Sequence, residues 1–113
     1  MSILRKAREL LTDPENWTKG AFHKTRRKSG GTTEHSYCAL GAWRKVSGKG
    51  LNDPGKARNL LFRALKEKTG RTCVIRYNDD HRTTHKDILE LFDLAICMEE
   101  CENEHTTGCA KLN

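Results

Sequence analysis

Residues 54–69 are the stretch that most limits what this chain can fold into. Its apolar residues recur at spacings of three and four, which puts them on one face of an α-helix: Ala57, Leu60, Leu61, Ala64 and Leu65. Pro54 suits the first turn of such a helix, and Gly70 suits its end. A helix with one apolar face must bury that face against other elements, so the chain needs further helices to form a core.

Three other segments show the same helical spacing of apolar residues: 2–12, 36–47 and 84–103. Residues 72–77 have instead the β-branched and aromatic composition of a short strand, which we expect to pair with the loop around residues 20–34. A chain of 113 residues is long enough to bury its own core. We therefore expect a mainly α fold, a single compact domain over residues 1–113 with about four helices and a short β-strand or hairpin element.

Several single residues predict local structure within this fold. Trp17 and Trp43 are expected to anchor the core, because no other side chain buries as much apolar surface. Ser36 is the expected N-cap of the second helix. Gly41 costs that helix about 1 kcal/mol relative to Ala. We therefore expect another segment to approach the backbone closely at Gly41.

The start of the last helix has a pattern of its own. Thr84 is followed three residues later by Asp87, which resembles a capping box and places a carboxylate at the positive end of the helix dipole. The helical period explains neither His85, at the first helical position, nor the preceding Asn78 and Asp79, although turns favour Asn and Asp. His85 is the residue of this stretch that is most open to a functional interpretation.

Cys38 is a candidate partner for His85. At the N-terminal end of the second helix, the helix dipole is expected to lower the pKa of its thiol. Cys38 as nucleophile and His85 as base, oriented by Asn78 or Asp79, would form the catalytic group of a thiol-dependent hydrolase or transferase. The alternative, which we favour, is a small buried thiol beside an ordinary helix start.

Positive charge is concentrated in the first half of the chain. Residues 1–50 hold eleven Lys or Arg and four acids, whereas residues 51–113 hold ten and eleven. Residues 24–35 form a basic stretch with two adjacent glycines, which predicts an exposed loop or a hairpin. The candidate binding residues lie at its start: Lys24, Arg26, Arg27 and Lys28. They could contact phosphates, although no zinc-finger spacing or aromatic RNA-binding signature accompanies them and a solvated face is the plainer interpretation.

The end of the chain has the opposite character. Residues 97–113 are expected to form an acidic, cysteine-rich tail, in which possible metal ligands recur every four residues: Cys97, Cys101, His105 and Cys109. Thiolates and imidazole suit zinc, provided that the chain turns back near Gly108 to bring all four together. We expect no cofactor here. The alternatives are zinc, or a disulfide between Cys101 and Cys109.

The sequence also bears on location. It contains no apolar run of the roughly 20 residues that a membrane span requires, and no secretory signal. Five cysteines cannot all pair with one another, which fits reduced thiols. We expect a cytoplasmic protein that does not contact a membrane, in a bacterial cell or an infected host.

The chain resembles a family of small uncharacterised proteins from bacteria and their phages. These proteins share a Trp-Thr-x-Gly element, a Cys-Ala-Leu-Gly-Ala segment, and an Asn-Asp turn followed by Thr-His and an amphipathic helix. The resemblance covers most of residues 3–96 and rests on these residues: Trp17, Thr18, Gly20, Cys38, Ala39, Leu40, Gly41, Ala42, Asn78, Asp79, Thr84 and His85. It implies a helical domain and no catalytic residue. The basic loop and the tail after Ile96 depart from the family pattern.

These observations favour a small accessory protein without enzymatic activity, related to phages, that binds a host macromolecule through its charged surface. A host protein is the preferred partner, because the seven acids between Asp87 and Glu104 would repel phosphate. Such a protein could modulate a host process or a defence. Nucleic acid, bound through residues 23–28, is the alternative partner, and the thiol enzyme is the alternative activity.

Overall fold

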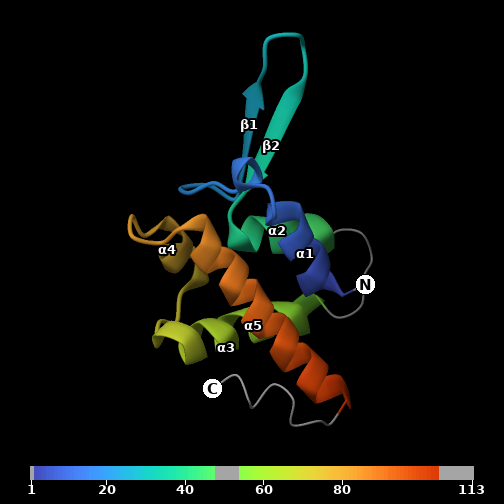
Figure 1. Ribbon diagram of the computed structural model, residues 1–113, viewed down its shortest axis with the longest axis vertical. Coiled ribbons are helices and arrows are strands. Elements are labelled where there is room, and N and C mark those ends of the chain that lie inside the picture. The colour runs from blue at the N-terminus through green and yellow to red at the C-terminus, as the bar shows by residue number, and fades with distance from the viewer. Residues whose placement is uncertain (1, 48–53, 105–113) are drawn as a thin grey trace.

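The computed structural model describes residues 2–47 and 54–104, which form a helical body with one β-hairpin (Figure 1). The elements in chain order are α1 (Ile3–Leu11), the 3-10 helix η1 (Pro14–Asn16), β1 (His23–Arg27), β2 (Thr33–Tyr37), α2 (Ala39–Ser47), α3 (Pro54–Thr69), α4 (Val74–Asp79) and α5 (His85–Glu104). The expectation of a mainly α fold with a short hairpin is confirmed.

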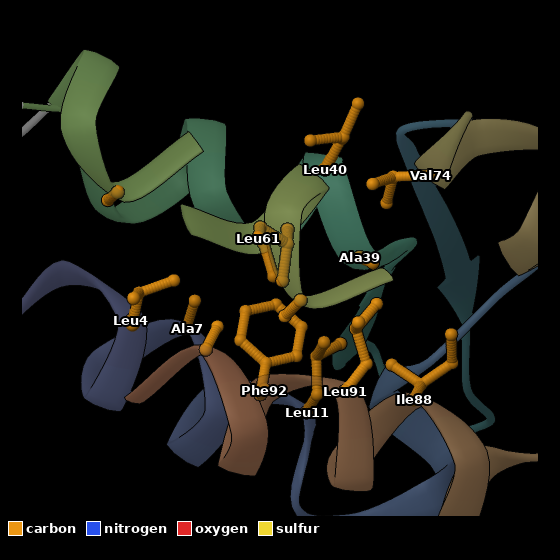
Figure 2. Packing of buried hydrophobic residues seen from close by; sticks show 14 of the residues in the cluster. Leu4, Ala7, Leu11, Ala39, Leu40, Leu61, Val74, Ile88, Leu91 and Phe92 are labelled. Atoms are coloured by element: carbon orange, nitrogen blue, oxygen red, sulfur yellow. The ribbon is translucent and has the colours of Figure 1, made fainter. Parts of the chain in front are cut away.

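The core lies between α1, α2, α3 and α5, as the apolar periods predict. Phe92, Leu91 and Ile88 of α5 are fully buried and face side chains from the other three helices (Figure 2). Each large apolar side chain that is removed from water in this way stabilises the fold by about 1.5–3 kcal/mol. Trp17 and Trp43 are only partly buried and pack against this core from outside.

Two expected helix boundaries are confirmed. The Thr84 N–H donates to Asp87 Oδ2 (3.0 Å), and the Asp87 N–H donates to Thr84 Oγ1 (3.2 Å), so the two residues form a reciprocal capping box at the start of α5. Gly70 directly follows α3 and has a positive φ of 78°, which ends the helix without the strain that a Cβ would cause.

The expected strand at residues 72–77 is wrong, because residues 74–77 belong to the short helix α4, which continues to Asp79. Val74, Tyr77 and Asn78 lie three and four positions apart, and all three are buried on one side of α4. Within residues 2–47 and 54–104, the two strands β1 and β2 pair with each other and not with this segment. Burial against the body therefore outweighs the β-rich composition of the segment.

The basic stretch forms an antiparallel hairpin, in which His23 is opposite Tyr37 and Arg27 is opposite Thr33. Gly30 and Gly31 both adopt positive φ in its turn, a conformation that other residues rarely reach. Ser36 therefore belongs to β2, and the expectation that it caps α2 is wrong. The Gly41 N–H instead donates to the sulfur of Cys38, which directly precedes α2 (3.2 Å).

The close approach expected at Gly41 is confirmed. A Cβ at this position would overlap the carbonyl group of Phe22, so only glycine lets the segment before β1 pass this near to α2. The same Phe22 oxygen accepts a hydrogen bond from the Cys38 N–H (3.2 Å). Gly41 thus determines where the hairpin leaves the body.

The hairpin extends away from the helices along the long axis of the molecule, whose extents are 50 × 33 × 19 Å (Figure 1). Among residues 2–47 and 54–104, no helix combines the length and the apolar character that a membrane crossing requires. The expected acidic tail is described only as far as Glu104, and its remaining residues lie outside the described residues.

Candidate functional site

Two polar regions contain most of the residues that the sequence singles out. The first is the hairpin of residues 23–37, here called the basic hairpin. All five residues of β1 are exposed, and three of them are cations: Lys24, Arg26 and Arg27. Lys28 follows directly, and its ammonium lies 3.3 Å from the Glu34 carboxylate. The hairpin therefore carries a clear excess of positive charge in contact with solvent.

The pairing register distributes these charges over both faces of the hairpin. Side chains alternate along a strand, and directly opposed residues share a face. Lys24 and Arg26, opposite Ser36 and Glu34, therefore lie on one face. Arg27 lies on the other face, so both faces of the hairpin carry at least one cation.

Three rings stiffen the foot of the hairpin on the face of Arg27. The His23 ring stacks on Tyr37, with centroids 4.7 Å apart, and on His35, with centroids 5.1 Å apart. His23 Nε2 and His35 Nδ1 are 2.9 Å apart and share a hydrogen bond. An isolated two-stranded hairpin is marginally stable in water, so these contacts help to hold this one in shape. The Thr18 N–H also donates to the Tyr37 carbonyl (3.0 Å).

Two more cations lie near this foot. The Arg44 guanidinium lies over the Phe22 ring, 5.0 Å from its centroid. Lys45 lines a hollow between the hairpin and the body, together with His35, Tyr37 and Leu10. Positive charge thus continues from the hairpin onto α2.

The second region is a set of hydrogen bonds that joins three distant segments, residues 17–20, 38–39 and 78–80, and is here called the polar junction. Its centre is Asn78, which is fully buried. Asn78 Oδ1 accepts from Trp17 Nε1 (2.7 Å) and from the Ala39 N–H (3.0 Å), and Asn78 Nδ2 donates to the Thr18 carbonyl (3.0 Å). A buried amide that is satisfied in this way fixes the relative positions of the segments.

Asp79 and Asp80 complete the junction. Asp79 Oδ1 accepts from the Gly20 N–H (2.8 Å). The Arg82 backbone N–H and then the Arg82 and Arg71 guanidinium groups hold the pKa of Asp80 well below its usual range. Burial opposes these bonds and has the weaker effect. The junction therefore explains Asn78, Asp79 and Asp80 by structural contacts.

Cys38 and His85 make different contacts. Burial raises the pKa of the Cys38 thiol, and the nearby Asp79 charge raises it further. The Gly41 N–H lowers the pKa but does not compensate for burial, so the expected lowering is wrong. His85 Nε2 donates to the Leu11 carbonyl at the end of α1 (2.6 Å), and its ring lies 6.0 Å from that of Trp17. The helical period gave His85 no structural role. In the fold, its hydrogen bond to the Leu11 carbonyl connects the start of α5 to the end of α1.

Cys38 and Asp79 do meet at a small pocket of about 180 Å³ beside the junction. Two large apolar residues, Phe22 and Ile75, line its other sides and are 41% and 39% exposed. His85 is not among its lining residues. This exposed apolar pair was not foreseen, because Ile75 lay in a segment that was assigned to a strand.

The proposed metal ligands are only partly described. Cys97 and Cys101 lie one turn apart in α5, while His105 and Cys109 lie outside the described residues. Across residues 2–47 and 54–104, no three His, Cys, Asp or Glu side chains are placed so as to hold a metal ion together.

Acids of α5 form ion pairs with cations of the neighbouring helices. Arg8 Nε lies 2.5 Å from Asp93, Lys68 Nζ lies 3.5 Å from Glu90, and Arg5 pairs with Glu100. These pairs bring cations up to the acidic face of α5 that was expected to repel phosphate. Ion pairing therefore reduces the negative charge with which α5 would repel phosphate.

Comparison with known proteins identifies the family. The chain belongs to a family of unknown function, DUF6197, whose profile matches residues 1–97. No curated protein and no solved structure matches the chain. The matched range contains both the basic hairpin and the polar junction.

Proposed function

We propose that this protein is a binding protein without catalytic activity and that it holds nucleic acid through the basic hairpin. The observation that supports this proposal most strongly is the exposed position of the basic hairpin, which extends from the helical body (Figure 1). Every residue of β1 is exposed. Four cations lie in β1 or directly after it: Lys24, Arg26, Arg27 and Lys28. Cations on such a hairpin can approach phosphates without moving the core. Each phosphate contact releases a condensed counterion, which drives binding at low salt.

The surroundings of Cys38 and His85 support the non-catalytic part of the proposal. A thiol nucleophile works as the thiolate, whereas burial raises the pKa of Cys38 and so favours the neutral thiol. A base must be able to reach its nucleophile, whereas Nε2 of His85 is engaged with the Leu11 carbonyl.

The distribution of charge supports nucleic acid as the partner. The acids that argued against phosphate lie on α5, and Asp93, Glu90 and Glu100 among them pair with cations of α1 and α3. Helix α5 ends at one end of the body, and the hairpin extends from the other end (Figure 1). The positive field of the hairpin is therefore well separated from the acidic end of α5.

A capture experiment tests the proposal. The tagged chain is used to capture material from bacterial lysate, with and without nuclease, and nucleic acid is quantified. The double variant Arg26→Ala with Arg27→Ala is expected to retain at least tenfold less nucleic acid than the unchanged chain. Lys66→Ala with Lys86→Ala removes two exposed cations of α3 and α5 and serves as the control of equal net charge. Equal retention by the hairpin variant and this control would overturn the proposal.

Phe22 and Ile75 favour a second candidate function, which is the binding of a protein. Exposed apolar side chains that gather in one place mark sites of protein contact, and Phe22 and Ile75 are both exposed and line one small pocket. In an accessory protein of bacterial or phage origin, the partner would be a host protein. The variant Phe22→Ser with Ile75→Ser should then lose a stoichiometric partner that resists nuclease, while the hairpin variant keeps it. Retention of that partner by the serine variant would exclude this surface.

A further inference from the structure

We infer that the partner of the basic hairpin is double-stranded DNA and that the hairpin enters the major groove. This inference rests on the proposed function and specifies its ligand. The major groove of B-DNA is about 12 Å wide and about 8.5 Å deep, and it admits a two-stranded β-ribbon. Strands in a ribbon lie about 4.8 Å apart, and a five-residue strand extends about 17 Å. The basic hairpin is therefore narrow enough to enter the groove and long enough to reach its floor.

Cations on both faces of the hairpin also favour a groove over a flat surface as the binding site. A groove has two walls, each lined by a phosphate backbone, so a ribbon inside it meets negative charge on both sides. The hairpin offers Lys24 and Arg26 on one face and Arg27 on the other. A flat acidic protein surface would be contacted by one face only and would leave the cation of the other face in solvent.

The end of the ribbon suits the floor of the groove. Arg26 and Arg27 are the last residues of β1, next to the turn, and their side chains are exposed. A guanidinium group can bond to two acceptors at once, either on a phosphate or on O6 and N7 of guanine. Arg44 and Lys45, on α2 at the foot of the hairpin, are placed to meet the phosphates at the rim of the groove.

Other forms of nucleic acid fit less well. The major groove of an RNA duplex is deep and narrow, so a ribbon with side chains on both faces cannot enter it. Single strands are held mainly by bases that stack on open aromatic rings. On this hairpin His23 already stacks on Tyr37 and His35, and Tyr37 is only 6% exposed.

The test is fluorescence anisotropy with the full chain and three labelled probes of one sequence: a 20-base-pair DNA duplex, the corresponding RNA duplex and the DNA single strand. We expect the DNA duplex to bind at least tenfold more tightly than either other probe at about 100 mM salt. Arg26→Ala with Arg27→Ala should weaken duplex binding at least tenfold and reduce the slope of log affinity against log salt by about 0.9 for each phosphate contact that it removes. Lys66→Ala with Lys86→Ala should change duplex affinity less than threefold.

A second variant separates groove contacts from simple charge. Arg26→Lys with Arg27→Lys keeps both charges and removes both guanidinium forks. If Arg26 and Arg27 reach the groove floor, this variant should lose at least threefold in affinity for the DNA duplex while its salt slope stays unchanged.

The outcomes separate this inference from the proposed function. Equal affinity for all three probes, all reduced by the alanine variant, would overturn groove entry and leave nucleic-acid binding by the hairpin in place. Tighter binding to RNA duplex or to single strand would likewise overturn groove entry. Binding that the alanine variant does not alter, or no binding to any probe, would overturn both proposals.

Discussion

The polar junction and the basic hairpin are both rich in polar side chains, but they use them in opposite ways. In the junction, the buried side chain of Asn78 bonds to groups from two distant segments of the chain. In the hairpin, Lys24, Arg26 and Arg27 face solvent. A polar group that is satisfied inside the molecule stabilises the fold, whereas a charge in solvent stabilises it little and remains available to a partner. The two regions should therefore respond to mutation in different assays.

Asn78→Ala should produce the largest loss of stability. It leaves Trp17 Nε1 and the Ala39 N–H without their acceptor and the Thr18 carbonyl without its donor, which should cost about 3–5 kcal/mol. Urea unfolding measures the loss. Asn16→Ala removes one partly buried bond, to the Leu10 carbonyl, and is the control. An equal loss of unfolding free energy in both variants would contradict the role of Asn78 in joining the three segments.

Gly41→Ala is expected to have the second-largest effect. The new Cβ would overlap the Phe22 carbonyl and force apart two segments that the Cys38 N–H now joins, at a cost of about 1–3 kcal/mol. At an open helical position the same change would instead stabilise the helix by about 1 kcal/mol. The sign of the change in unfolding free energy therefore shows whether Phe22 lies this close to Gly41. Lys45→Ala, at an exposed site on the same helix, is the control and should leave the unfolding free energy nearly unchanged.

Asp80 gives a smaller effect that depends on pH. Because bonds from Arg82 and Arg71 lower its pKa in the folded state, Asp80 stabilises the fold above the ordinary aspartate pKa of about 3.9. This contribution is lost as pH falls below that value towards the lowered pKa. Asp80→Asn should therefore be less stable than the unchanged chain at pH 7, and the difference should shrink by pH 3. A difference that is the same at both pH values would show that these bonds do not depend on the charge of Asp80.

The hairpin should give the smallest effect on stability. Arg26→Ala with Arg27→Ala removes two exposed side chains at the end of β1, and its unfolding free energy should stay within about 0.5 kcal/mol of that of the unchanged chain. Thermal unfolding provides the measurement. A loss comparable to that of Asn78→Ala would contradict the division between a region that stabilises the fold and a region that is free to bind.

Local patterns predicted some contacts of the candidate sites and missed others. The exposure of Arg26 and Arg27 followed from a run without apolar residues. The bonds of Asn78 could not be predicted, because its partners Trp17 and Ala39 lie 61 and 39 residues away. The raised pKa of Cys38 was missed for a similar reason, since the burial that causes it comes from distant segments.

The sequence by itself determined α1, α3 and α5, the capping box of Thr84 with Asp87, and the end of α3 at Gly70, because these depend on residues within one or two turns of each other. Only the tertiary structure decided that residues 74–79 are helical, since burial of Val74 and Tyr77 against the body outweighs a β-rich composition. It also decided that Asn78 joins three segments and that the hairpin extends from the body, since these features depend on contacts between residues far apart in the chain.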